Sequence, residues 1–169
     1  MKRKKNIIDE ISFLMMDTGD SGNDNSIMKH INDIPDIDLK GRDGRTLLIH
    51  ACAYNKKTIV QHLIDKSADL NLQDDMGYSA LHACVISNNL DCAKLLVQAG
   101  ANINLCDNIG NVPLFYVSKG AYDMLHLLLA HGANFNAKNI YDVSPIDTFQ
   151  ADSVAIQIFD KYTRGNKYV

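Results

Sequence analysis

Residues 77–84 read GYSALHAC, and the architecture of the chain follows from the recurrence of this segment. Residues 44–51 read GRTLLIHA and residues 110–117 read GNVPLFYV, so the segment returns every 33 residues. A second phrase keeps the same rhythm and reads ADLN at 68–71, ANIN at 101–104 and ANFN at 133–136. Two phrases that recur in one order at one period predict an array of stacked supersecondary units.

Each unit is predicted to begin with a tight turn that leads into a first helix. A glycine such as Gly77 lies in this turn, where it tolerates a positive φ. Thr46 and Ser79 follow their glycines by two residues and are natural N-caps. Pro113 takes the equivalent region of the third unit and suits a first helical turn.

A second helix is predicted to close each unit. In the middle unit it buries residues 90, 93, 96 and 97 at helical spacing, and Gly100 ends it. Gly132 ends the second helix of the third unit, whereas the first unit has Ser67 at this place. The third unit is one residue short, with 32 residues from Asn104 to Asn136, and we place the loss near residues 120–121.

The repeat length and the residues of the recurring segments resemble the ankyrin repeat, whose signature is Thr-Pro-Leu-His-x-Ala. Residues 79–84 are the nearest copy, the third unit has Phe115 at the His position, and the first has Ile49 there. A degenerate fourth copy starts at Ser144. The resemblance covers about residues 35–159. It implies an all-α repeat solenoid of helix-turn-helix repeats joined by β-hairpin loops, with capping units at both ends.

The predicted domain organisation has three parts. Residues 1–34 form an N-terminal helical cap, with residues 1–5 disordered, a helix over 7–16 to which Phe13 adds bulk, and a loop over 17–25. A second helix starts at a cap residue, Asn25 or Ser26, and ends at Pro35. Residues 35–160 hold three full repeats from about 41, 74 and 107 and a degenerate capping repeat from about 139. Residues 161–169 are expected to be a frayed tail.

Composition excludes several classes of partner. The net charge is −3, which gives no reason to expect nucleic acid or a membrane surface. The basic run at residues 2–5 is read as the solvated start of a helix, with a nuclear-localisation or anionic-surface patch as the alternative. The four cysteines form no CxxC pair, so they are read as small core thiols. We expect a monomer in reducing cytosol, either its own or that of a host cell.

No catalytic constellation is present in the sequence. His126 and His131 are five residues apart on a helix and share no face, so a zinc site is not expected. No GxSxG motif and no phosphate-binding glycine loop occurs. His82 lies in the His position of the repeat, where the resemblance implies hydrogen bonds between neighbouring repeats. We therefore expect no enzyme activity, no cofactor and no metal.

What remains is a binding surface. The resemblance implies that a protein partner is held on the concave face, by the hairpin tips and the exposed side of each first helix. The positions that match are Arg42, Arg45, Ala53, Tyr54, Asp75, Met76, Tyr78, Ile86, Ser87, Asn108, Ile109, Asn111, Lys119, Ile140, Tyr141 and Val143. The structural positions are Thr46, Gly77, His82, Gly100, Pro113 and Gly132.

The apolar residues at the tips are the most informative members of this set, because solvation alone would favour polar ones. Met76, Tyr78, Ile109, Ile140 and Tyr141 would form a stripe typical of a protein interface. The alternative is that Ile109 and Ile140 pack one hairpin against the next. With arginines at one end, the stripe suggests a partner that has an acidic edge and an apolar centre.

Two functional hypotheses follow from a binding surface. The first is a stand-alone adaptor or inhibitor, either a microbial or viral protein that acts on a host factor or an immunity-type protein. The composition, rich in Ile, Asn, Lys and Asp, suits an AT-rich genome and favours this hypothesis. The second is a regulatory or scaffolding subunit of an endogenous enzyme or signalling complex. The resemblance also implies that Asn71 and Asn104 can be hydroxylated by a cytosolic dioxygenase.

Overall fold

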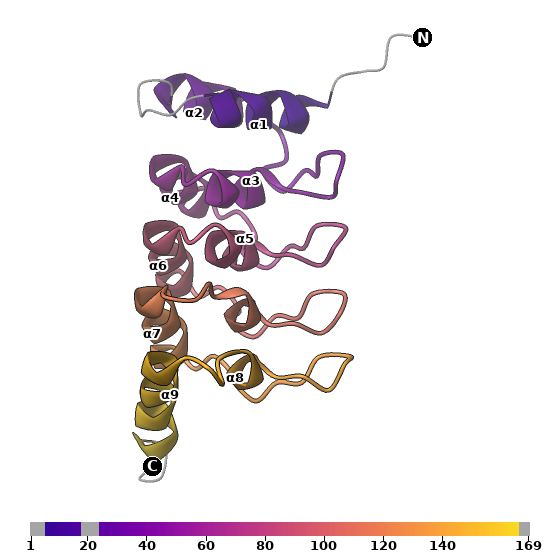
Figure 1. Cartoon of the computed structure of the whole chain (residues 1–169). Helices are drawn as coiled ribbons and strands as arrows, with labels where there is room; N and C mark the ends of the chain where they lie inside the picture. The colour runs from indigo at the N-terminus through magenta and orange to yellow at the C-terminus, as the bar shows by residue number, and fades with distance from the viewer. Residues whose placement is uncertain (1–5, 18–23, 166–169) are drawn as a thin grey trace.

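The computed structural model describes residues 6–17 and 24–165, which form a stack of helix pairs (Figure 1). The inner layer holds α1 (Ile7–Asp17), α3 (Leu47–Ala53), α5 (Ala80–Ile86), the 3-10 helix η2 (Pro113–Tyr116) and α8 (Pro145–Thr148). The outer layer holds α2 (Asp24–Asn32), α4 (Lys57–Asp65), α6 (Leu90–Gln98), α7 (Tyr122–Ala130) and α9 (Ser153–Gly165). This arrangement confirms the predicted all-α solenoid.

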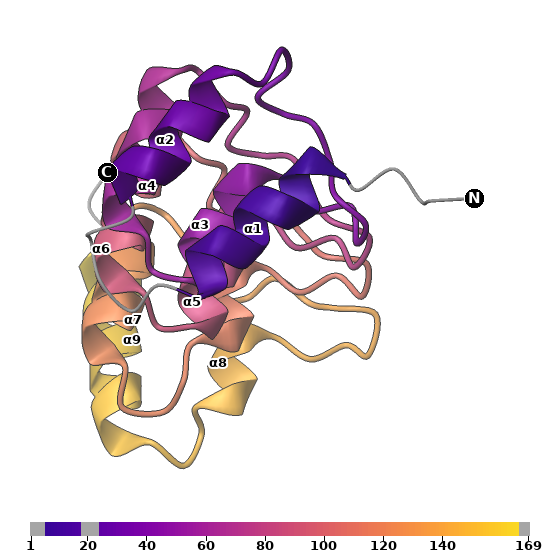
Figure 2. The same cartoon turned by 90° about the horizontal axis from the view of Figure 1, so that it is seen from above.

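Hairpin loops project from the inner layer, all on the same side of the stack (Figures 1 and 2). Their ends, which we call the first to fourth tips, are residues 41–45, 74–78, 107–111 and 139–143. Each tip is closed by a backbone hydrogen bond from its first to its fifth residue, as from Asp74 N–H to the Tyr78 carbonyl at 3.0 Å. The hairpins are turns, since the described part of the chain contains no β-strand.

Most helices of the repeats are too short to be stable alone, so stacking has to supply their stability. The same positions are buried in successive units, as with Leu48, Leu81 and Leu114 in the inner layer. In the outer layer, Leu63 and Leu96 are fully buried at equivalent positions. One core therefore runs through the whole stack.

Side chains at the starts of the inner helices bind the free backbone N–H groups there. The Thr46 hydroxyl accepts from Ile49 N–H at 3.3 Å. Ser79 forms a capping box with His82, and Ser144 forms one with Asp147. These pairs fix where the first helix of each unit begins.

Left-handed backbone conformations end the outer helices. Gly100 has φ +89° and Gly132 has φ +86°, and Ser67 adopts φ +62° in the equivalent place. A serine pays a steric penalty in this region that a glycine avoids. At this position the first repeat therefore has a strained serine where the other two repeats have glycine.

The third repeat departs from the others in its first helix. η2 is a 3-10 helix of 4 residues, whereas α3 and α5 have 7 residues each. It is followed by Gly120 at φ +86°, next to the place where the sequence is one residue short. The short 3-10 helix and the missing residue thus occur in the same connection between the inner and outer layers.

The N-terminal helices differ from the prediction in detail. α2 begins at Asp24, so neither Asn25 nor Ser26 precedes it as a cap, and it ends at Asn32, before Pro35 is reached. Phe13, which was expected to add bulk to this helix, lies on the solvent side of α1 and is 62% exposed. The basic run at 2–5, the expected disorder of 1–5 and most of the expected loop, 18–23, lie outside the described residues.

The predicted frayed tail, residues 161–169, begins inside the last helix. α9 runs from Ser153 to Gly165 without a break. The Tyr162 ring lies 6.0 Å from that of His126 on α7, so the last turns of α9 pack on the preceding outer helix. Residues 166–169 lie outside the described residues.

Candidate protein-binding surface

A ladder of backbone hydrogen bonds joins the four tips. Asp75 N–H donates to the Asp43 carbonyl at 3.1 Å, and Asn108 N–H donates to the Met76 carbonyl at 3.2 Å. Ile140 N–H then donates to the Ile109 carbonyl at 3.0 Å. We call these bonds the tip ladder. It holds the tips in one row, so side chains at matching positions lie side by side along the array.

The first tip is joined to the N-terminal cap in the same manner. Arg42 N–H, the equivalent of the donors in the later tips, donates to Asp9 Oδ1 of α1 at 3.0 Å. The Arg42 guanidinium is exposed and lies 4.0 Å from the same carboxylate. The Asp9 carboxylate therefore replaces the carbonyl of a preceding tip, and the sequence pattern gave no signal for this role.

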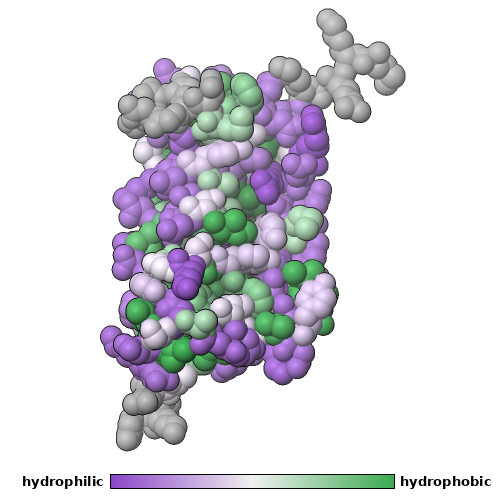
Figure 3. Space-filling view, in the orientation of Figure 1, coloured by the Kyte–Doolittle hydropathy of each residue, from purple (hydrophilic) through white to green (hydrophobic). Residues whose placement is uncertain are grey.

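The later tips expose large apolar side chains. Met76 is 59%, Ile109 38%, Ile140 66% and Tyr141 68% exposed. We call these four residues the tip patch; Figure 3 shows apolar surface on the hairpin side of the lower repeats. With about 200 Å² for a whole side chain of this size, the patch exposes about 450 Å², an area characteristic of functional patches on a monomer.

Polar and aromatic groups fill the space beneath the second and third tips. His82 Nδ1 accepts from Ser79 N–H at 3.2 Å, so the ring proton is on Nε2, which donates to the Asn111 carbonyl at 3.2 Å. This bond joins two repeats. The Tyr116 hydroxyl donates to Asp107 and accepts from the Asn111 amide at 3.0 Å.

Burial shifts the pKa of several groups in the inner layer. Desolvation lowers the pKa of His82 below its ordinary value of 6.5, because a charged imidazole is poorly solvated there. Desolvation also lowers the pKa of His50, whose Nδ1 is buried without a hydrogen-bond partner within the described residues. Burial raises the pKa of the Tyr116 phenol. All three groups are therefore uncharged at neutral pH.

Tyr78 is held from below and is only half exposed. Its ring lies 5.5 Å from Tyr116 and 5.7 Å from His82, and its hydroxyl is 3.3 Å from that of Tyr116. Replacing Tyr78 should therefore lower stability as well as any binding, because its ring and hydroxyl contact Tyr116 and His82. Tyr78 supports the hairpin, and Met76 and Tyr141 are the better probes of binding.

Two further predicted contact residues face inward. Asn111 is only 4% exposed and is wrong as a contact residue, because its amide group bonds to Tyr116 and Asn139. The Arg45 guanidinium of the first tip donates to the buried Asp74 carboxylate of the second tip at 3.1 Å, so this cation is already paired within the protein. An acidic edge on the partner would therefore meet Arg42 alone of the two arginines.

The remaining predicted residues divide by exposure. Those exposed to solvent are Arg42, Asp75, Met76, Ile86, Ser87, Asn108, Ile109, Lys119, Ile140 and Tyr141. Those half-buried are Arg45, Ala53, Tyr54, Tyr78 and Val143. Of the structural positions, Thr46, Gly77, His82 and Pro113 are buried, and Gly100 and Gly132 are exposed.

A second ladder, made by side chains, runs along the base of the hairpins. Asp38 Oδ1 accepts from Asp69 N–H at 3.0 Å, Asn71 Oδ1 from Asn102 N–H at 2.8 Å and Asn104 Oδ1 from Asn134 N–H at 2.7 Å. Each carboxylate or amide thus ties its repeat to the next. Asn71 and Asn104 are exposed, and hydroxylation of either one remains a proposal.

The sequence reasoning missed the acids at the starts of the tips. Asp74 Oδ1 accepts from Met76 and Tyr78 N–H groups, both at 2.9 Å. Asp107 and Asn139 make the equivalent bonds in the next two tips. The recurrence of a short polar residue three positions before the turn glycine at 74 and 107 was the available signal. These side chains set the shape in which the tip patch is presented.

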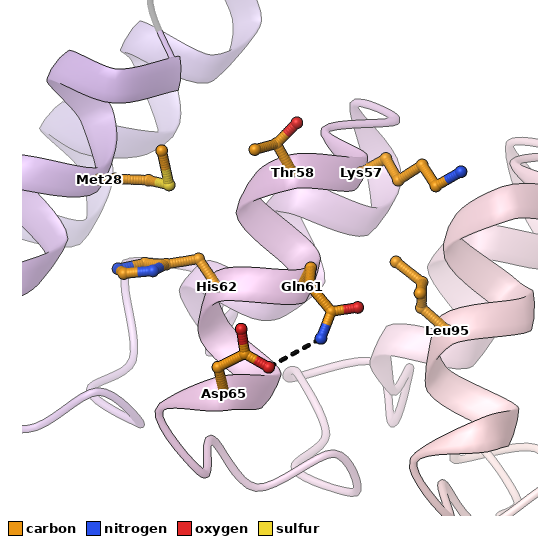
Figure 4. Close-up of a pocket in the computed structure, with 7 residues that line it drawn as sticks. All are labelled: Met28, Lys57, Thr58, Gln61, His62, Asp65 and Leu95. Carbon is orange, nitrogen blue, oxygen red and sulfur yellow. Dashed lines mark hydrogen bonds between the residues drawn. The ribbon is translucent and has the colours of Figure 1, made fainter.

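The outer face carries a shallow groove between α2, α4 and α6, and most of its exposed lining surface is apolar (Figure 4). Met28 and Leu95 are its apolar walls, and the α4 residues between them hydrogen-bond mainly to protein. Gln61 donates to Asp65 at 2.8 Å, and His62 Nε2 lies 3.0 Å from Asn32 Oδ1. These side chains satisfy one another, so the groove offers few groups to a ligand.

The described side chains were compared with the requirements of a metal site, a reactive thiol and a membrane-spanning helix. Across residues 6–17 and 24–165, no group of three or more His, Cys, Asp or Glu side chains is placed to hold a metal ion. All four cysteines are free; Cys52, Cys84 and Cys92 are buried, and burial raises the pKa of the Cys84 thiol. None of the helices in the described part of the chain combines the length and apolarity needed to cross a bilayer.

Comparisons with known proteins agree with this geometry. A family model for three ankyrin repeats matches residues 14–107, and one for a single ankyrin repeat matches residues 109–140. Neurogenic locus notch homolog protein 1 of Homo sapiens is 39% identical over 84 residues, which are 50% of this chain and 3% of that protein. Inversin of Homo sapiens is 33% identical over 101 residues, 58% of this chain and 10% of that protein. The chain thus spans a small part of each relative.

Proposed function

Because this chain belongs to the ankyrin repeat family, we propose that it is a non-catalytic module that binds a protein partner through its tips and inner helices. The tip patch is the observation that carries this proposal. Four large apolar side chains stand in one row on a hydrogen-bonded ladder, where solvation would favour polar residues. A rigid row of this kind binds without the entropic cost of ordering a loop.

The area of the patch matches the apolar part of an ordinary interface. A standard interface buries about 800 Å² on each partner, of which a little over half is apolar. The tip patch alone supplies roughly that apolar area. Exposed polar residues such as Asp75 and Asn108 lie beside it on the same tips and would form the rim. Ile86, 44% exposed at the end of α5, extends the surface onto the inner helices.

We further propose that the module acts as a stand-alone adaptor or inhibitor in reducing cytosol, as a monomer and without nucleic acid or membrane. The free cysteines support the compartment. A microbial or viral host-targeting role rests on composition alone, and relatives in Homo sapiens give it no support. A regulatory or scaffolding subunit of an endogenous complex is the second candidate, favoured because each matched region forms part of a longer protein.

The test compares three forms of the protein in affinity capture from cytosol. The Met76→Ala/Tyr141→Ala double variant removes two members of the tip patch. The Val154→Ala/Ile156→Ala variant removes apolar side chains of α9 that are 44% and 40% exposed, far from the tips, and is the matched control. A protein retained by the wild type and the control but lost by the tip variant supports the proposal. A protein retained equally by all three contradicts it.

A further inference from the structure

The tip ladder is closed at one end and open at the other. At the first tip, Asp9 Oδ1 occupies the place of a preceding carbonyl and accepts Arg42 N–H. At the fourth tip, Tyr141 holds the position of the earlier acceptors Asp43, Met76 and Ile109. Within residues 6–17 and 24–165, no backbone N–H donates to the Tyr141 carbonyl. In Figure 1 the fourth tip is the last of the row, and α9 ends on the opposite side of the stack.

The fourth tip has the same backbone shape as the others, so its free carbonyl points along the array. Asn139 N–H donates to the Val143 carbonyl at 2.9 Å, as Asp74 N–H does to Tyr78 at 3.0 Å. Asp142 N–H donates to the Asn139 carbonyl at 3.0 Å. Asp142 has φ +60° at the position that glycine holds in the other tips. The acceptor geometry of the ladder is therefore repeated at its open end.

The side-chain ladder ends in the same way. Asn136 N–H donates to Asn134 Oδ1 at 3.0 Å, just as Asn104 N–H donates to Asn102 Oδ1. Asn104 Oδ1 in turn accepts Asn134 N–H of the next repeat. For Asn136 no such acceptor bond occurs in the described part of the chain, and the residue is exposed. Two acceptors in line with the array thus stand at the same end.

The side chains at the two ends differ in character. The first tip presents Arg42 and Asp43, which are both charged and exposed. The fourth tip presents Ile140 and Tyr141, the two most exposed members of the tip patch. The open end is therefore the apolar end, which is the combination that an added backbone segment needs: acceptors for its N–H groups and apolar contacts for its side chains.

We propose that the partner contributes an extended segment that continues the tip ladder at the fourth tip. One backbone N–H of this segment donates to the Tyr141 carbonyl, and an apolar side chain next to it packs on Ile140 and Tyr141. The proposal rests on the proposed function and specifies which part of the surface the partner enters and by what bonds. Backbone pairing supplies affinity, and the apolar contact supplies selectivity.

A second copy of this chain does not fit as the occupant. In a head-to-tail arrangement the donor of the second copy would be Arg42 N–H, which Asp9 already binds in every copy. In a tail-to-tail arrangement the Tyr141 carbonyls would face each other, acceptor against acceptor. Two copies therefore do not pair tip to tip, and we take the occupant to be an extended segment of a partner protein with a free backbone donor.

The test uses a displayed library of random twelve-residue peptides selected on the full-length protein. Peptides that bind the wild type and the Val154→Ala/Ile156→Ala control, but not Ile140→Ala/Tyr141→Ala, are synthesised and mapped by NMR on the labelled chain. We expect amide shifts at residues 136–143. We also expect that N-methylation of one particular peptide amide, which removes a single donor, weakens binding about tenfold, the value of one hydrogen bond near 1.4 kcal/mol.

Other outcomes separate this inference from the proposed function. Peptides whose shifts fall on the inner helices or the first three tips would overturn the open-end inference and leave the tip surface as the binding site. Binding that tolerates N-methylation at every amide would also overturn it, because no backbone donor is then involved. Failure to enrich any peptide over the Ile140→Ala/Tyr141→Ala variant overturns it as well. The proposed function fails separately, by equal capture on wild type and Met76→Ala/Tyr141→Ala.

Discussion

Alanine substitution at Gly77, in the second tip, tests how closely neighbouring tips approach one another, and the same substitution at Gly100 is the control. Both have a positive φ, +82° and +89°, so alanine at either place costs about 1–2 kcal/mol of backbone strain, partly offset by a less flexible unfolded chain. Their surroundings differ. A Cβ at Gly77 would lie 2.6 Å from the Asn108 nitrogen and 2.9 Å from the Asp107 carbonyl carbon, whereas nothing lies within 4 Å of one at Gly100.

The clash at Gly77 involves backbone of the third tip, so the tip itself has to move. The Asn108 N–H bond to the Met76 carbonyl would lengthen or break, which costs about 1 kcal/mol, and overpacking adds about 1–3 kcal/mol. We expect Gly77→Ala to lose about 3–5 kcal/mol and Gly100→Ala about 1 kcal/mol. Urea denaturation followed by circular dichroism measures both. Equal midpoints for the two variants would refute the close approach of the tips.

Three more predictions follow from single groups. Ser67→Gly should raise the free energy of unfolding, measured in urea, by about 0.5–1 kcal/mol, because the native φ is +62°. An unchanged free energy would show that Ser67 carries no backbone strain in the folded protein. Tyr116→Phe should lose about 1–2 kcal/mol because the buried Asp107 loses a donor, and an unchanged midpoint would contradict this. The pKa values of His50 and His82 are lower in the folded protein than their ordinary value of 6.5. The free energy of unfolding should therefore be constant above about pH 6.5 and fall below it, because the unfolded chain then binds more protons than the folded one. An unfolding free energy that does not change from about pH 7.5 to 5 would refute this.

The repeat itself could be predicted because its period constrains many positions at once. Ser79 as a cap and the positive φ at Gly77 follow from local chemistry that recurs in each unit. The strain at Ser67 was likewise visible as a departure from the glycine of the other units. Such features depend on a residue and its near neighbours in sequence, which a single sequence displays directly.

The contacts between repeats were harder to predict. Tyr78 was expected to be free, and its exposure depends on Tyr116, 38 residues further along. Tyr116 lies on a 3-10 helix in the repeat that is one residue short, and its hydroxyl bonds to Asp107 at the third tip. Asp9 lies outside the repeat altogether, and its role follows from a geometry that the period does not describe. In each case a single sequence does not show which side chain of the neighbouring unit contacts the residue in question.

Position within the tip separates inward-facing residues from the outward-facing residues that we propose contact the partner, and this separation is testable. The fifth position of each tip faces inward: Arg45, Tyr78, Asn111 and Val143 are all half-buried or buried. The second and third positions face outward in every tip, from Arg42 and Asp43 to Ile140 and Tyr141. Alanine at Met76, Ile140 or Tyr141 should therefore change affinity at nearly constant stability, because each of these outward residues is more than half exposed in the free protein. Alanine at the fifth position should lower both together, since the loss of an inward anchor moves the backbone that presents the outward residues.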